Sequence, residues 1–290
     1  MTNTEVAKRV HLGPNPFERS QPIAEHGFSA LIRVKQGDKA GAFLFDTGVT
    51  RKGILYNMDA LEVNVSDIQT IVLSHGHPDH SMGLLGLIDR LGTRRLSLLL
   101  HPDAFLGRKL ILPNGTEINV PPPKKTDLQQ ANIDVIEEIG PSLLLDGMVL
   151  ISGEVARITE FEKGFPIHYA RRGNTWEPDP QIMDDQCAII NVRGKGLVII
   201  TGCGHAGIIN IIHHAQNLTG IKTVYAVIGG FHLSGGLFES IIPVTIETLR
   251  TISPRYVVPC HCTGWSAVHQ IARAMPGSFI ANSVGTNYIL

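Results

Sequence analysis

Short apolar runs that end at glycine-rich turns recur along the chain and predict alternating strands and helices. Residues 28–34 and 42–45 are rich in aliphatic and aromatic side chains and predict two strands joined by a polar turn, most simply as an antiparallel hairpin. A further apolar strand ends at Ser74, and a helical period of apolar residues begins after Pro78 and continues to Leu91. The N-terminal part of the chain therefore predicts a hairpin followed by a strand–loop–helix unit.

The middle of the chain is less regular than either end. Residues 106–147 contain a Pro-Asn-Gly turn, a run of three prolines and a predicted helix after Asp127, which together indicate an inserted excursion. Residues 161–185 are polar, and because so long a connection in a compact domain is often functional, we expect a flap over a site. From Cys187 onward strands and helices alternate again.

The composition is typical of a compact soluble protein. Of 290 residues 43% are hydrophobic, and 25 Lys and Arg nearly balance 26 Asp and Glu, for a net charge of −1. This argues against a disordered chain and against nucleic-acid binding through bulk charge. No run reaches the ~20 apolar residues of a membrane-spanning helix, and residues 1–20 lack the apolar core of a signal peptide. We expect a cytoplasmic protein whose four cysteines, too few for a disulfide framework, are thiols.

Potential metal ligands gather where the predicted strands end. Four apolar strands lead into turns at residues 74–77, 202–205, 229–232 and 260–262. The histidines and the cysteine of interest in these turns are His75, His77, Cys203, His205, His232 and His261. In open α/β sheets ligands bind beyond the carboxyl ends of the strands, so we expect one common site built from all four turns.

The densest cluster is the run His75, His77, Asp79 and His80. Alternate residues of an extended loop point the same way, so His75 and His77 can present imidazoles to one ion, while Asp79 and His80 can serve a second ion nearby. Neutral imidazoles and a carboxylate suit zinc, and also manganese or iron. Such clusters rarely lack a metal or catalytic role. We therefore predict two divalent metal ions, with zinc favoured.

These residues resemble a known family. The run from His75 to His80 matches the HxHxDH signature of the metallo-β-lactamase superfamily, and residues 46–48 match its strand-end Asp-Thr-Gly. Residues 201–203 lie where that superfamily carries a strand-end Gly-Asp, and residues 259–261 resemble its last histidine ligand. Further motifs at residues 25–29, 202–208 and 228–233 are similar to the branch of dihydropterin-ribofuranosylaminobenzene-phosphate synthase-like metallohydrolases. The resemblance spans residues 25–264.

The resemblance implies an α/β fold, the four-layer αββα metallo-β-lactamase sandwich, with the metals at one sheet edge. This agrees with paired strands first and strand–helix alternation afterwards. A single domain over residues 1–290 then accounts for the whole chain, with the excursion around 106–147 and the flap around 161–185 as additions to it.

The ligand set departs from the family pattern at two places. The third histidine of the first ion has no counterpart at residues 183–186. Two replacements are open: Asp185 takes the place of this histidine, or His205 folds back into the site. The bridging carboxylate is replaced by Cys203, which is either a soft ligand that favours zinc or a small buried thiol. One ion would thus be held by His75, His77 and His205 or Asp185, and the other by Asp79, His80, His261 and Cys203. Cys260 and Cys262 alternate with His261 and are expected to face away from the metals.

The predicted chemistry is hydrolysis of an ester, lactone, amide or phosphoester. Two ions lower the pKa of a bound water toward ~7 and generate hydroxide at neutral pH. Asp79 would orient this hydroxide and pass its proton to the leaving group, and His232 or His26 would stabilise negative charge that develops on the substrate. Two alternatives stay open: a condensation that joins a pterin to an aminobenzene ribotide with release of diphosphate, which the branch implies, and a non-catalytic metal or ligand sensor.

Cationic and aromatic residues in the irregular segments suggest the substrate class. The flap carries Arg171, Arg172 and Trp176, and the excursion carries Arg108 and Lys109. An aromatic ring beside cations suits a planar, anionic small molecule, such as an aryl or heterocyclic phosphate. The alternative is that these charges are merely solvated. The sequence leaves the oligomeric state open, including a homo-oligomer.

Overall fold

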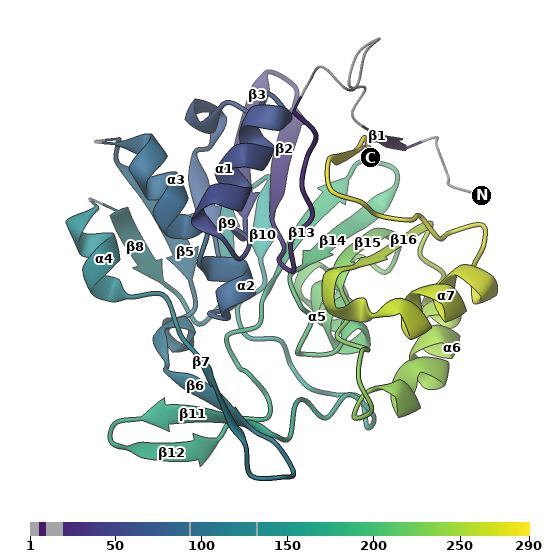
Figure 1. Ribbon diagram of the computed structural model, residues 1–290. Coiled ribbons are helices and arrows are strands. Elements are labelled where there is room, and N and C mark those ends of the chain that lie inside the picture. Colours follow the sequence, from purple (N-terminus) through teal and green to yellow (C-terminus); the bar gives the residue numbers. More distant parts are fainter. Residues whose placement is uncertain (1–5, 10–19, 93, 132) are drawn as a thin grey trace.

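Two large β-sheets dominate the part of the chain that the computed structural model describes, residues 6–9, 20–92, 94–131 and 133–290 (Figure 1). The first sheet has the order β2-β3-β4-β5-β8, with bounds Ala30–Gln36, Lys39–Phe45, Thr70–Val72, Leu96–Leu100 and Ile133–Glu137. The second has the order β16-β15-β14-β13-β10-β9, with bounds Tyr256–Cys260, Val224–Gly230, Gly196–Thr201, Cys187–Val192, Val149–Ile151 and Ser142–Leu144.

Helices cover the outer face of each sheet. On the first sheet these are α1 Arg51–Ala60, α3 Leu84–Leu91 and α4 Lys125–Gln130, with the single turn α2 Pro78–Ser81 at the sheet edge. On the second sheet they are α5 Ile208–Thr219, α6 Ile242–Ile252 and α7 Trp265–Ala274. Short 3₁₀ turns lie at Val65–Asp67, Pro102–Phe105, Glu239–Ile241 and His261–Thr263. The chain also pairs β1 Ala7–Arg9 with β17 Thr286–Tyr288.

Three buried cores hold the layers together. Between the sheets, Phe43 and Phe45 of β3 pack against side chains of the second sheet such as Ile200. Leu44, which lies between them in the sequence, points to the other face and packs beneath α1 and α3. Alternate residues of a strand face opposite sides, so a strand buried on both faces is apolar throughout.

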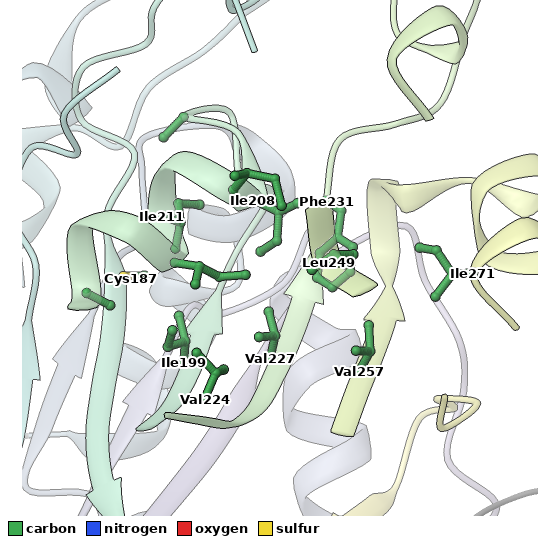
Figure 2. Close-up of a cluster of buried hydrophobic side chains, with 14 of the residues drawn as sticks. Cys187, Ile199, Ile208, Ile211, Val224, Val227, Phe231, Leu249, Val257 and Ile271 are labelled. Atoms are coloured by element: carbon green, nitrogen blue, oxygen red, sulfur yellow. The ribbon is translucent and has the colours of Figure 1, made fainter. Parts of the chain in front are cut away.

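The third core lies between the second sheet and its helices. Ile199, Val227 and Val257 from adjacent strands meet Ile211 of α5 and Leu249 of α6 (Figure 2). The layers therefore run helix, sheet, sheet, helix, which confirms the predicted αββα sandwich.

The predicted N-terminal elements form with small changes. β2 and β3 pair as an antiparallel hairpin, with Ala30 opposite Phe45. The helix expected to run from Pro78 to Leu91 is instead two helices, interrupted at Met82 and Gly83. At Gly83 the backbone N–H donates to the carbonyl oxygen of Gly48 at 3.2 Å instead of continuing the helix, and a Cβ there would lie 1.9 Å from the carbonyl oxygen of Thr47.

The prediction of one excursion over residues 106–147 is wrong in extent. β8 is an edge strand of the first sheet, parallel to β5, and β9 pairs with β10 in the second. The pairing of β8 with β5 joins segments distant in sequence and leaves no local signature, because it depends on tertiary contacts. β9 and β10, by contrast, are neighbours in the sequence and form a hairpin. The Pro-Asn-Gly turn does connect a hairpin, β6 Arg108–Ile111 and β7 Glu117–Val120.

This hairpin and the predicted flap form one structure. Residues 161–185 contain β11 His168–Arg172 and β12 Thr175–Pro178, and β11 pairs with β6. The result is a small four-stranded sheet of order β12-β11-β6-β7, placed below the sandwich in Figure 1. Among the described residues no helix is long and apolar enough to cross a membrane. The expectation that residues 1–20 carry no signal peptide concerns a segment of which most residues lie outside the described ones.

Candidate metal centre

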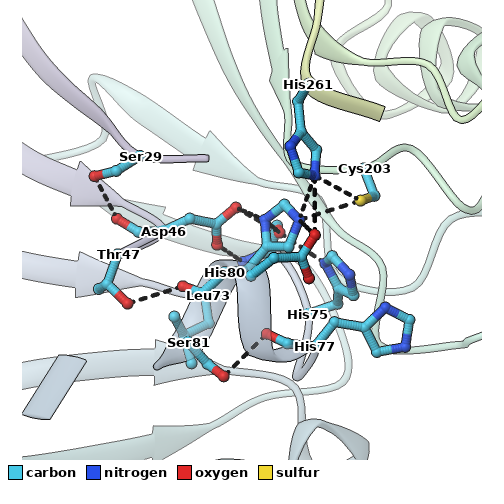
Figure 3. Close-up of polar contacts among 12 residues, drawn as sticks. Ser29, Asp46, Thr47, Leu73, His75, His77, His80, Ser81, Cys203 and His261 are labelled. Atoms are coloured by element: carbon cyan, nitrogen blue, oxygen red, sulfur yellow. Dashed lines mark hydrogen bonds and ion pairs between the residues drawn. The ribbon is translucent and has the colours of Figure 1, made fainter. Parts of the chain in front are cut away.

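The carboxyl ends of the parallel strands of both sheets meet at one edge of the sandwich. β4 leads into the turn that carries residues 75–80, β14 into Cys203 and His205, and β16 into His261. The side chains from these turns converge, as Figure 3 shows for His75, His80, Cys203 and His261. The predicted convergence of strand-end turns is therefore seen in the fold.

Four side chains form the first candidate group, namely Asp79, His80, Cys203 and His261. His80 Nε2 lies 3.1 Å from Cys203 Sγ and 3.1 Å from His261 Nε2, and Cys203 Sγ lies 3.2 Å from His261 Nε2. Asp79 Oδ2 lies 3.1 Å from His261 Nε2 and 3.6 Å from His80 Nε2. Ligands of a tetrahedral zinc ion at about 2.0–2.3 Å are themselves about 3.3–3.8 Å apart. The donor set and its spacing fit one ion.

The second candidate group contains His75, Cys203 and His205. His77 adjoins it, with Nδ1 3.2 Å from His205 Nε2. His75 Nδ1 contacts the hydroxyl of Ser74 at 2.9 Å, whereas His75 Nε2 is buried with no hydrogen-bond partner. A buried polar atom without a partner is costly, and a metal ion at this place would satisfy it. Cys203 belongs to both groups, so the two sites adjoin.

Asp46 orients His80 from behind. Its carboxylate accepts the backbone N–H of Ser74 at 2.6 Å and the Ser74 hydroxyl at 2.7 Å, and it lies 2.7 Å from His80 Nδ1. Burial alone would lower the pKa of His80, but the charge and hydrogen bond of Asp46 outweigh it and raise the pKa to about 9. The contact places a proton on Nδ1 and leaves Nε2 facing the other ligands.

Four of the other candidate ligands, His75, His77, Asp79 and His205, have the charges that metal binding needs. Burial, together with the neighbouring imidazoles, keeps the pKa values of His75 and His205 well below the usual range. Burial and Arg108 do the same for His77. Burial would raise the pKa of Asp79, but the hydrogen bond from His261 and the charge of His80 lower it overall. Neutral imidazoles beside an ionised carboxylate are typical metal ligands.

The two cysteines that flank His261 differ from the expectation that both face away. Cys260 packs against the core between the sheets, and burial raises its pKa to about 12. Cys262 turns toward the site, where its thiol donates to the backbone oxygen of Cys203 at 3.2 Å and forms a third group with Cys203 and His232. The strand ends at Cys260 and a 3₁₀ turn begins at His261, whose φ is +49°, so the alternation of a strand no longer applies.

Asp185 and His205, the alternative ligands, have different surroundings. Asp185 is buried, and its Oδ2 accepts the backbone N–H of Ala206 at 2.9 Å. It belongs to none of the candidate metal groups found among the described residues. The geometry therefore brings His205 into the second group and leaves Asp185 to hold the turn on which His205 lies. Glu162 supports the same turn, because its carboxylate accepts the first free N–H groups of α5.

Other histidines named from the sequence lie at the rim or elsewhere. The ring of His232 is tilted against that of His205, with 4.2 Å between ring centroids, and its Nδ1 is buried without a hydrogen-bond partner. His26 is exposed, and its Nε2 lies 3.6 Å from Asp79 Oδ2. His101 is outside the site, where its Nε2 lies 3.1 Å from Glu154 Oε1.

Sequence reasoning missed one histidine of the site. His168 of β11 is fully buried, and its Nε2 lies 2.9 Å from Nε2 of His77. Its neighbours in the sequence are those of an ordinary short strand. Only its contact with His77, in the loop of residues 75–80, identifies His168 as part of the site.

The cations of the small sheet are not a free anionic-substrate site. Arg108 is buried and pairs with Asp179 and Asp184, and Arg172 pairs with Asp103. Lys109 pairs with Glu117 at 2.6 Å and lies over the ring of Trp176. Arg171 is exposed and alternates with the inward-facing His168 and Ala170, so it points away from His77.

Comparison with known proteins agrees with the fold. A family model for the metallo-beta-lactamase superfamily matches residues 23–210. The chain belongs to the metallo-β-lactamase superfamily. Within this superfamily it is 31% identical over 253 residues to 7,8-dihydropterin-6-methyl-4-(beta-D-ribofuranosyl)-aminobenzene-5'-phosphate synthase of Methanocaldococcus jannaschii, which covers 84% of this chain and 83% of that protein.

Two further relatives extend the match. An uncharacterized protein of the same organism is 30% identical over 267 residues, with 91% of this chain and 93% of that protein covered. The crystal structure of Tm1679, described as a metal-dependent hydrolase of the beta-lactamase superfamily, superposes with a TM-score of 0.74 at 25% identity and covers 94% of this chain and 96% of that one. The superfamily assignment thus holds over nearly the whole chain.

Proposed function

We propose that this protein is a metal-dependent hydrolase with two adjoining divalent ions, zinc favoured over manganese or iron. The observation that carries the proposal is the convergence of two ligand groups on the shared thiol of Cys203. His75, His77 and His205 would hold one ion, and Asp79, His80 and His261 the other, with Cys203 between them. A thiolate among imidazoles favours zinc. When bound, such a pair of ions supplies Lewis acidity and activates water.

The residues around the proposed ions would have different roles in hydrogen bonding and proton transfer. The lowered pKa of Asp79 keeps its carboxylate ionised, which suits a ligand and hydrogen-bond acceptor better than a proton donor. His232 and His26 are further candidates for proton delivery to a leaving group. Of these, His232 has a buried, unpartnered Nδ1 beside His205 and is our candidate for the catalytic donor.

The surroundings of His232 favour an aromatic substrate. Phe165 lies 5.4 Å and Phe238 4.6 Å from its ring, measured between centroids. Rings of this kind stack on aryl or heterocyclic groups. Arg108 and Arg172 are paired with carboxylates, so these side chains do not support an anionic substrate. The support for an anionic group is the name of the 31%-identical synthase, which contains a phosphate.

That relative also favours a second candidate function. A synthase that joins a pterin to an aminobenzene ribotide and releases diphosphate would use the same ligands, and its name describes a product of this class. In either case a small molecule with an aromatic group reaches the metals.

The test combines metal analysis with a substrate panel. Protein purified without chelator is expected to contain about two divalent ions per chain by elemental analysis. It is then assayed on aryl phosphates, cyclic phosphodiesters, lactones, aryl esters and β-lactams, and for diphosphate release from an aminobenzene ribotide with a pterin. His232→Phe is expected to lower turnover with the metal content unchanged. Full metal content with no turnover on any substrate would instead support a sensor.

A further inference from the structure

His77 lies between two other histidines and presents a different nitrogen to each. Its Nδ1 is 3.2 Å from Nε2 of His205, and its Nε2 is 2.9 Å from Nε2 of His168. Only Nδ1 faces the second ligand group. An imidazole nitrogen binds a metal ion through its lone pair, so His77 can be a ligand only if Nδ1 carries no proton.

The surroundings of His168 decide where its own proton lies. Its Nδ1 is 3.1 Å from the backbone oxygen of Asp179 and 3.5 Å from the carboxylate of the same residue. Both of these oxygens are acceptors, so Nδ1 of His168 is the donor. The Asp179 carboxylate is already paired with Arg108, and we take the buried His168 as the neutral imidazole, which has a single N–H. With that proton on Nδ1, Nε2 of His168 is an acceptor. The facing Nε2 of His77 must then donate.

We propose that His168 is a positioning residue that sets the tautomer of His77, with the proton on Nε2 and the lone pair of Nδ1 free for a metal ion. The hydrogen bonds run in one direction, from Nε2–H of His77 to His168, and from Nδ1–H of His168 to the backbone of Asp179. The inference rests on the proposed function in assigning His77 as a ligand, while the tautomer itself follows from the protein contacts alone.

A buried charged network fixes this arrangement in place. Arg108 Nε lies 3.3 Å from Asp179 Oδ2, and the same guanidinium contacts the carboxylate of Asp184 at 3.0 and 2.5 Å. Asp184 in turn accepts the backbone N–H of Gly76 at 2.8 Å. Arg108, Asp179 and Asp184 are 2%, 6% and 0% exposed. The network therefore contacts the loop of residues 75–80 at two places. Asp184 binds the backbone of Gly76 directly, and Asp179 contacts the ring of His77 through His168.

The small sheet acquires a role from these contacts. Arg108 comes from β6 and His168 from β11, and the two strands pair with each other beneath the sandwich (Figure 1). The small sheet, which includes the segment of residues 161–185 that the sequence predicted as a flap, thus supports a proposed metal ligand through hydrogen bonds.

Two substitutions of His168 separate positioning from packing. His168→Phe keeps a ring of similar size but offers no acceptor, and His168→Gln offers an amide oxygen that can accept from Nε2–H of His77. We expect zinc affinity at the His77 site, measured by competition with a chromophoric chelator, to fall about 10- to 100-fold in the Phe variant and to recover in the Gln variant. No loss in His168→Phe, or an equal loss in both variants, would overturn the proposal.

His101→Phe is the matched control. His101 is also buried, and it makes one contact to a backbone N–H and one to a carboxylate, away from the metals. This variant should lose thermal stability and keep the zinc affinity of the wild type.

A direct measurement needs neither a variant nor an active enzyme. In metal-free wild-type protein labelled with nitrogen-15, the imidazole resonances of His77 should show Nε2 protonated and Nδ1 unprotonated. A proton on Nδ1 would refute the proposal even if every variant bound zinc as expected. Failure of the substrate panel would refute the hydrolase assignment and leave this result unaffected.

Discussion

Asp46→Asn should weaken metal binding although Asp46 is itself no ligand. The carboxylate receives three contacts, from the N–H and hydroxyl of Ser74 and from His80 Nδ1, all within 2.6–2.7 Å. An Asn side chain has one oxygen to accept and an NH₂ group that can only donate. If its oxygen accepts the N–H of Ser74, its NH₂ group faces His80 Nδ1, which must then accept. The proton of His80 moves to Nε2, the nitrogen that faces Cys203 and His261.

The expected loss follows from the role of such supporting groups. Removing a carboxylate that orients a ligand histidine typically lowers metal affinity 10- to 100-fold, which corresponds to about 1.4–2.8 kcal/mol. The assay is competition for zinc with a chromophoric chelator. Elemental analysis after gel filtration should show the ion at Asp79, His80 and His261 lost first.

Asp59→Asn is the matched control, since Asp59 is an exposed carboxylate that pairs with Arg90 at 2.8 Å. It should leave zinc affinity unchanged. If Asp46→Asn folds and binds zinc as tightly as the wild type, the orientation of His80 by Asp46 does not matter for binding, and the reasoning is refuted.

Three further outcomes are expected. His75→Ala and Asp79→Ala should each reduce the metal content, because the two residues serve different ions, and elemental analysis showing full content in both would contradict the site. Cobalt-loaded wild type should show near-ultraviolet sulfur-to-metal charge transfer that Cys203→Ser removes; if loaded wild type lacks it, Cys203 is a buried thiol. Burial raises the pKa of Glu162 to about 7 from 4.5, so the folded state binds more protons than the unfolded one between these values. The contribution of Glu162 to the free energy of unfolding of metal-free protein should therefore fall with rising pH in this range, by at most about 1.36 kcal/mol per unit. By chemical denaturation, the slope in Glu162→Gln should differ from that of the wild type by up to this amount.

Much of the fold was predictable because its signals are local. Apolar runs, their alternation and the glycine-rich turns after them depend on neighbours in the sequence. The β2–β3 hairpin and the strand–helix units after Cys187 therefore formed as expected. β8 and β9 were missed as sheet strands, because a strand at a sheet edge is defined by the partner it meets rather than by its own residues.

In the candidate site, too, some residues were predictable from local sequence signals and others were not. The sequence by itself determined that His75, His77, Asp79 and His80 lie on one turn after a strand, since their spacing places them together in any fold that forms that turn. Only the tertiary structure decided which distant groups join them. It brought His205 rather than Asp185 into a candidate ligand group, turned Cys262 inward at a 3₁₀ turn, and set His168 against His77 from a separate sheet. His168 and His205 both contact His77, and they lie 91 and 128 residues after it in the sequence. Contacts between side chains so far apart in the sequence are decided by packing, for which the sequence carries no local signal.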